Sequence, residues 1–211
     1  MNKLTNKVAL VTGGSRGIGA AIAKRLAADG ASVVITYAKD ASAASAVVKA
    51  IELGGGKAIA IQADAADVEA VRSAVAKAVA TFGRLDVLVN NAGTAIPKPF
   101  EEATLEEMGR VIDINVRGVF ATTQAALKHL HDGGRIKLGG RGITVNNVQP
   151  GPIDTDLNPA SGDWALPQKA ATALDRYGRA DEIAAMVAFV AGPESSYITG
   201  ANLTVDGGMN A

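Results

Sequence analysis

Residues 7–19 read KVALVTGGSRGIG, an apolar run that passes directly into a glycine-rich turn. The run predicts a buried strand over residues 7–12, and the apolar spacing of residues 18–29 predicts a helix after the turn. Glycines in between let the backbone turn sharply and approach a ligand closely. Because the free N–H groups and the dipole at a helix N-terminus favour a diphosphate, the stretch predicts a dinucleotide-binding turn. A tight turn without a ligand is the alternative.

The alternation of strand and helix continues along the chain. Apolar runs predict strands and helical periodicity predicts helices, in the order strand 32–37, helix 41–53, strand 58–62, helix 68–82 and strand 85–90. Apolar strands separated by long helices are typical of a parallel sheet covered on both faces. We therefore expect an α/β fold, a Rossmann-type three-layer α/β/α sandwich with a doubly wound, mostly parallel sheet of about seven strands. The length favours a single domain over residues 1–211.

The second half of the chain shows the same kinds of signal. Thr104 and Glu107 have the spacing of a capping box, which predicts a long helix running toward His131. Three further elements are predicted, a strand over 143–148, a helix over 180–191 and a last strand over 201–205. Residues 156–175, which include Trp164, form either a mobile substrate lid or a surface helix.

One interval breaks the alternation. Residues 134–136 look like the start of a fifth strand, yet only residues 137–141 separate them from the next strand. A parallel crossover needs a dozen or more residues and usually a helix. Either the protein lacks this crossover, or residues are missing from the sequence between Ile136 and Leu138. We favour the second interpretation, since a deletion would abolish a core crossover; it predicts about 35 to 40 further residues and a break in peptide geometry near 136–138.

The composition excludes several classes of protein. Lysine plus arginine balances aspartate plus glutamate at 21 each, so no overall field attracts nucleic acid or an anionic membrane. The absence of cysteine excludes disulfides and thiolate metal sites, and His129 and His131 have no partners at metal-ligand spacing. No leader peptide is recognisable, and no apolar run approaches the roughly 18 residues of a membrane span. We expect a cytoplasmic protein without a metal ion.

The glycine spacing G-x-x-x-G-x-G over residues 13–19 resembles the classical short-chain dehydrogenases/reductases. Other segments resemble the same family, namely residues 90–93 (NNAG), Asn115, residues 150–155 (PGPIDT), residues 197–200 (YITG) and residues 206–208 (DGG). Residues 15–19 and 197–200 are most similar to the 3-oxoacyl-[acyl-carrier-protein] reductase branch. The resemblance implies an NADPH-dependent reductase of a small-molecule ketone or 3-oxoacyl substrate, assembled as a homotetramer or homodimer.

Ligands of open α/β sheets bind at the carboxyl ends of the strands, so the cofactor site is expected in the loops that follow them. Matched to the family, the cofactor-binding positions are Gly13, Ser15, Arg16, Gly17, Ile18 and Gly19, then Tyr37 and Lys39, then Asp64 and Ala65, then Asn91, Ala92 and Gly93, and finally Pro150, Gly151, Ile153 and Thr155. The last group matches the family's nicotinamide loop, although a structural Pro-Gly turn is the alternative.

The choice between NADP(H) and NAD(H) depends on charge near the second strand. NAD-selective folds place an acidic residue at its end. Here Tyr37 occupies the tip, and Asp40 is better explained as the cap of the next helix. Arg16 and Lys39 instead carry the charge to pair with a 2′-phosphate, unless they are solvated surface residues. NADP(H) is therefore preferred, with NAD(H) as the alternative. Asp64 and Ala65 match the family positions that flank the adenine; Asp64 is also a candidate turn residue before the next helix, and the two roles are compatible.

The family moves a proton with a tyrosine, a lysine four residues later and a serine, supported by an asparagine. A phenol with a pKa of about 10 needs a neighbouring cation to work near pH 7. By its place in the motif, Asn115 fills the asparagine role. None of the tyrosines precedes a lysine by four residues, as the pairs Tyr37 and Ala41, Tyr177 and Asp181, and Tyr197 and Ala201 show.

Three functions are consistent with these observations. If residues are missing near 136–138, the protein is an NADPH-dependent carbonyl reductase. If the sequence is complete, it is a non-catalytic protein that binds NADP(H) or another nucleotide and has a regulatory role. A structural subunit of an oligomer is the third alternative.

Overall fold

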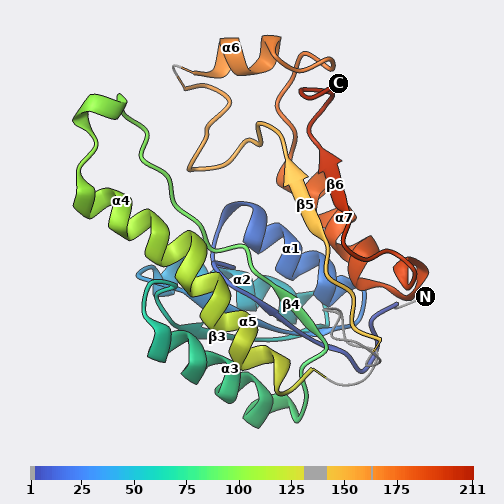
Figure 1. The fold of residues 1–211 in the computed structure, drawn as a ribbon. Helices are drawn as coiled ribbons and strands as arrows, with labels where there is room; N and C mark the ends of the chain where they lie inside the picture. The colour runs from blue at the N-terminus through green and yellow to red at the C-terminus, as the bar shows by residue number, and fades with distance from the viewer. Residues whose placement is uncertain (1–2, 131–141, 163) are drawn as a thin grey trace.

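The computed structural model describes residues 3–130, 142–162 and 164–211. Its first half is a regular α/β unit made of β1 (Val8–Val11), α1 (Gly17–Ala28), β2 (Ser32–Tyr37), α2 (Ala41–Leu53), β3 (Lys57–Gln62), α3 (Val68–Phe82) and β4 (Val87–Val89). The four strands form one parallel sheet in the order β3-β2-β1-β4 (Figure 1). The elements predicted for this half are therefore confirmed.

The sheet is covered on both faces because its strand residues alternate between two cores. Ala9 and Val11 of β1 belong to a core that α1, α2 and α7 (Ala180–Ala191) complete. Val8 and Leu10 face a second core, which α3 and α5 (Val119–Leu127) complete. Period-two alternation of apolar side chains on a central strand produces the three layers.

The second half is less regular. It contains η1 (Phe100–Glu102), α4 (Leu105–Ile112), the π-helical segment η2 (Asp113–Gly118), α5, β5 (Asn147–Pro150), α6 (Ala165–Ala170), α7, η4 (Pro193–Ser195) and β6 (Asn202–Val205). Strands β5 and β6 pair in parallel as a separate two-stranded sheet. None of the helices within the described ranges has the length and apolarity needed to span a membrane.

Two predicted elements differ from the structure. The helix predicted from Thr104 toward His131 begins with the expected capping box, but a π-helical segment interrupts it and α5 ends at Leu127. The strand predicted over 143–148 begins only at Asn147, because its ladder with β6 begins at the pair Asn147 and Asn202. A residue belongs to a strand only where a neighbouring strand pairs with it.

The predicted sheet of about seven strands is seen in part. The described ranges contain six strands, divided between two sheets, and together they form a Rossmann-type fold with a parallel central sheet. The predicted fifth strand at 134–136 and the predicted break at 136–138 lie outside the described residues.

Candidate cofactor-binding site

The glycine-rich turn joins β1 to α1 at the carboxyl edge of the sheet. Gly13 and Gly17 have φ angles of 64° and 53°, a left-handed conformation that favours glycine. The tip of β2 holds the turn, since Gly13 N donates to Thr36 Oγ1 (3.2 Å) and Gly14 N donates to Thr36 O (2.9 Å). A Cβ on Gly19 would collide with the carbonyl oxygen of Gly13. Glycine at these positions therefore lets α1 begin directly against the end of β1.

The N-terminus of α1 has no side-chain cap among the described residues, whereas Asp40 and Asp67 cap α2 and α3. Arg16 is the N-cap residue, and the first turn of α1 contains no acidic side chain. First-turn N–H groups of a helix have no partner within the helix, and the dipole makes that end positive. The predicted residues Ser15, Gly17 and Ile18 thus lie where backbone donors are available to an anion.

The end of β4 is joined to the end of β1 by hydrogen bonds of the Thr12 hydroxyl and of the Asn91 side chain. Thr12 Oγ1 accepts hydrogen bonds from Asn91 N and Ala92 N, both at 3.0 Å. The Asn91 side chain donates to Thr12 O (2.9 Å) and Gly13 O (3.1 Å). A Cβ on Gly13 would lie 2.9 Å from Ala92 Cα. The structure therefore brings the NNAG turn, ending in Gly93, against the glycine-rich turn.

The loops after β2 and β3 lie side by side, because Tyr37 pairs with Gln62 at the ends of the two strands. Asp40 Oδ1 accepts from Ala43 N (2.8 Å), so the prediction that Asp40 caps the next helix is confirmed. Lys39 follows Tyr37 on the exposed side of this loop. The Asp40 carboxylate thus serves as a helix cap, and residues 32–39, which form β2 and its tip, contain no acidic side chain.

Asp64 makes local contacts of the turn type and one long-range ion pair. Its Oδ1 accepts from Ala66 N (3.0 Å) and its Oδ2 accepts from Arg110 of α4 (2.6 Å). Burial raises the pKa of Asp64, but the Arg110 and Ala66 hydrogen bonds and the charge of Lys39 lower the pKa overall. The carboxylate stays ionised. Sequence reasoning missed Arg110, because no local pattern links α4 to the end of β3.

The predicted nicotinamide loop follows β5 and reaches the glycine-rich turn. Pro150 pairs with Val205, and Gly151 N donates to Val205 O (3.1 Å). At the other end of the loop, Thr155 Cγ2 lies 3.4 Å from the position of a Cβ on Gly17. The two loops come from separate sheets, and the structure nevertheless places them in contact.

Asn115 lies in η2 and holds the residue after the NNAG turn. Its Oδ1 accepts from Thr94 N (2.9 Å) and its Nδ2 donates to Thr94 O (2.8 Å). A Cβ on Gly93 would lie 3.6 Å from Asn115 Oδ1. The close approach of Gly118 to Ala65 O packs the same helical segment against the loop after β3. Asn115 thus lies beside the predicted cofactor loops, and its role in a proton relay stays a prediction.

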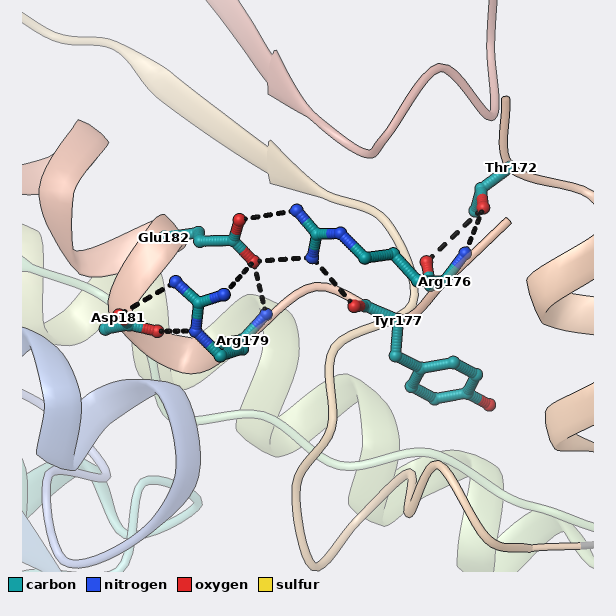
Figure 2. Close-up of polar contacts among 6 residues, drawn as sticks. All are labelled: Thr172, Arg176, Tyr177, Arg179, Asp181 and Glu182. Carbon is teal, nitrogen blue, oxygen red and sulfur yellow. Dashed lines mark hydrogen bonds and ion pairs between the residues drawn. The ribbon is translucent and has the colours of Figure 1, made fainter. Parts of the chain in front are cut away.

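An ion-pair network at the start of α7 supports the predicted nicotinamide loop (Figure 2). Glu182 accepts two hydrogen bonds from Arg176 (2.9 and 2.7 Å) and one from Arg179 N (2.7 Å). The Arg176 hydrogen bond and then the Arg179 N–H lower the pKa of Glu182 to about 2. Between the two arginines, Gly178 N donates to Pro152 O (2.9 Å) and Gly178 O accepts from Asp154 N (3.0 Å). Sequence reasoning also missed this network.

The chain matches two family models. Residues 7–137 match the model described as short chain dehydrogenase, and residues 136–210 match the model described as Enoyl-(Acyl carrier protein) reductase. A 3-oxoacyl-[acyl-carrier-protein] reductase of Synechocystis is 39% identical over 99% of both chains. A crystal structure of a short chain dehydrogenase from Burkholderia cenocepacia in complex with NADP superposes with a TM-score of 0.97, at 49% identity, and covers 99% of this chain and 100% of that one.

The alignments also show a difference in length. An uncharacterised oxidoreductase of Methylorubrum extorquens is 42% identical over 247 residues, which cover 99% of this chain and all of that protein. The present chain has 211 residues, so at least 36 aligned positions have no counterpart in it. The chain belongs to the short-chain dehydrogenase/reductase family of NAD(P)-dependent oxidoreductases.

Proposed function

We propose that the chain binds NADP(H) at the carboxyl edge of its sheet and that the protein reduces a ketone or 3-oxoacyl carbonyl to an alcohol. The observation that carries this proposal is the uncapped N-terminus of α1, which lies beneath the glycine-rich turn and in contact with the NNAG turn and Thr155. The relative named as a 3-oxoacyl-[acyl-carrier-protein] reductase and the short chain dehydrogenase structure in complex with NADP agree with this proposal.

The charges around the site favour a phosphorylated ribose. The Arg16 side chain is 69% exposed, and its partner in an ion pair is Asp156, at 4.0 Å. A pair this long between exposed groups contributes little, so the guanidinium is available to bind a phosphate. Lys39 adds a second cation, and the carboxylate of Asp40 is occupied as a helix cap. Arg16 and Lys39 would hold the 2′-phosphate.

The residues of the chain bind and orient the cofactor, while the hydride is supplied by the nicotinamide when it is bound. The amides of residues 15–19 would hold the diphosphate, and the loop over 150–155 would hold the nicotinamide end. A carbonyl reduction also needs a proton donor. We place that donor, with the partners that lower its pKa, in the crossover that the sequence lacks between Ile136 and Leu138. The length difference from the relatives supports the absence of a segment of this size.

Residues 156–175 form the lid in this proposal. The helix α6 stands apart from the α/β body in Figure 1. Leu157, Trp164 and Leu166 expose most of their apolar surface on this segment. Exposed apolar side chains clustered on one segment favour a role in binding. Closure of the segment over an apolar substrate would bury them and exclude water.

Coenzyme titration tests the binding step. NADPH and NADH fluorescence would be titrated with the wild-type chain and with the variant Arg16→Ala/Lys39→Ala. Loss of two charge contacts to the 2′-phosphate should weaken NADPH binding by about 10- to 100-fold and leave NADH binding nearly unchanged. The control is Arg72→Ala, on α3, whose exposed ion pair with Glu69 lies outside the proposed site. Failure of the folded wild-type chain to bind either coenzyme would refute the proposal.

Intact mass and turnover test the catalytic step. A polypeptide of 21.4 kDa has only the residues of the present sequence, and we then expect NADPH binding without turnover, as the regulatory alternative requires. A heavier polypeptide that oxidises NADPH with a panel of ketones and 3-oxoacyl thioesters would support the reductase. Sedimentation of the same sample tests the proposed homotetramer or homodimer.

A further inference from the structure

The side chain of Tyr177 connects the lid segment to the rest of the protein. Tyr177 is only 6% exposed, and it lies two residues after the end of the lid segment. Its hydroxyl lies 3.0 Å from Gln168 Oε1 and 3.3 Å from Asn158 Oδ1. Asn158 Nδ2 in turn donates to Gln168 Oε1 (2.8 Å). The three polar groups therefore form a closed set of hydrogen bonds.

The two amide partners come from different parts of the lid segment. Gln168 is a residue of α6. Asn158 closes the turn over residues 155–158, in which its backbone N donates to Thr155 O (3.0 Å) and its O accepts from Thr155 N (3.4 Å). Thr155 is the last residue of the proposed nicotinamide loop. A single phenol hydroxyl therefore links the lid helix with the end of that loop.

The backbone of Tyr177 is held from the opposite side. Tyr177 O accepts from Arg176 Nη1 (3.0 Å), and Glu182 of α7 binds the same guanidinium. Near the end of the lid segment, Thr172 Oγ1 accepts from Arg176 N (3.2 Å). Figure 2 shows the Tyr177 ring turned away from the arginine and carboxylate groups. The ring thus extends from a fixed backbone toward the lid, and loss of its hydroxyl would leave the ion-pair network intact.

We propose that Tyr177 is a positioning residue whose hydroxyl holds the lid against the nicotinamide loop. The inference rests on the proposed function, because it assigns the position of the lid a role in retaining the bound dinucleotide. A phenol has one hydrogen to donate, so the hydroxyl serves the two amide oxygens in turn. The contact is a single neutral hydrogen-bond set, weak enough to break when the lid moves and specific enough to restore the lid to the same position.

The variant Tyr177→Phe tests the inference because it keeps the ring and removes the hydroxyl. Amide hydrogen exchange over residues 164–171 should become about fivefold faster, the factor expected from one lost hydrogen bond. Exchange in α3 should not change. Stopped-flow dissociation of NADPH should accelerate by a similar factor. Tyr197→Phe is the matched control, since Tyr197 is fully exposed and the same atom is removed.

The outcomes separate this inference from the proposed function. If the wild-type chain does not bind NADPH, the proposed function fails, while the exchange measurement still decides the contact between Tyr177 and the lid. If the wild-type chain binds NADPH and Tyr177→Phe shows unchanged exchange and dissociation, the inference is overturned. Faster exchange throughout the chain would also overturn the inference, because that result indicates a general loss of stability. Should Tyr177→Phe not fold, Gln168→Leu removes the hydrogen-bond partner of Tyr177 on α6. This variant must then show the same faster exchange over residues 164–171, with exchange in α3 unchanged.

Discussion

The sheet of β1 to β4 and the pair β5 and β6 differ in how completely they are covered. All four residues of β1 are buried, and the central four of β2 are buried as well. Three of the four residues of β5 are exposed, and β6 alternates exposed with partly exposed positions. The two sheets share the loops of one site. The difference teaches that the proposed phosphate-binding side of the site depends on a complete core, whereas the proposed nicotinamide side depends on loops and ion pairs.

The largest effect is expected from Asp86→Ala, in the half of the chain that forms the covered sheet β1 to β4. The Asp86 carboxylate is buried at the edge of the sheet opposite the site, where it accepts from Val8 N (3.0 Å), Lys7 (3.2 Å) and Arg84 (2.5 and 2.7 Å). Removing it leaves a buried N–H without a partner, so we expect a loss of about 3 kcal/mol in the free energy of unfolding. Urea denaturation measures the loss.

The control for that variant is Asp113→Ala, which breaks an exposed i,i+4 pair with Arg117 and should cost less than about 0.5 kcal/mol. Equal losses in the two variants would show that burial of the carboxylate is not what stabilises the first half.

A matched pair of glycine variants tests the close packing of the phosphate-binding side. Gly19→Ala, in α1, places a Cβ against Gly13 O, whereas the Cβ of Gly109→Ala, in α4, meets no atom within 4 Å. Gly19→Ala should destabilise the chain by about 1–3 kcal/mol and weaken NADPH binding at least tenfold. Gly109→Ala should stabilise by about 1 kcal/mol through helix propensity and leave binding unchanged. Thermal unfolding and NADPH titration of both variants measure these effects; equal behaviour would contradict the packing argument.

A smaller effect, dependent on pH, is expected from Glu182→Gln on the nicotinamide side. The folded pKa of Glu182 is lowered to about 2 from the ordinary value of 4.5, so the folded state binds the proton more weakly than the unfolded chain. The ion pair therefore stabilises the protein above about pH 4.5, and this contribution is lost as the pH falls toward 2.

Urea midpoints of the wild-type chain and Glu182→Gln, measured from pH 6 down to pH 2.5, check this expectation. The variant should be modestly less stable at pH 6, and the two curves should approach each other in acid. A difference that stays constant with pH would mean that the carboxylate charge is not involved.

The smallest effect is expected at the apolar side chains that α4, η2 and α5 expose. Phe120 is 68% exposed, and Val116 is exposed one turn before it. In a polypeptide of 211 residues Phe120→Ser should change stability by less than about 0.5 kcal/mol. A loss of about 2 kcal/mol or more would show that further residues or a second subunit cover this face. The same denaturation assay, run beside an intact-mass measurement, separates these two cases.

Much of the first half could be predicted from local patterns. Helical spacing and apolar runs identified α1 to α3 and β1 to β4, and the glycine spacing identified the turn before α1. Asp40 and Thr104 were recognised as helix caps, because capping depends on residues only three positions apart. Local sequence determines such elements, so the sequence of one protein is enough to predict them.

The remaining features depend on distant residues. The π-helical segment around Asn115 has no periodicity of its own, and it contains the residue whose amide binds Thr94, 21 positions earlier. The pair of Asp64 with Arg110 spans 46 positions. The first residue of β5 is decided by where β6 can pair with it. Tertiary contacts of this kind leave no local pattern in the sequence.

The hydrogen bonds of the Thr12 hydroxyl have a consequence for the kinetics of coenzyme binding. The hydroxyl accepts from two successive amides of the NNAG turn and lies 3.4 Å from Val89 O, so its hydrogen-bonding capacity is fully used within the protein. The spacing between the loops proposed to receive the diphosphate and the ribose is therefore set before the coenzyme arrives. A preorganised cradle requires little rearrangement on binding. The association rate should accordingly follow solvent viscosity, and differences in affinity among coenzymes should appear mainly in their residence times.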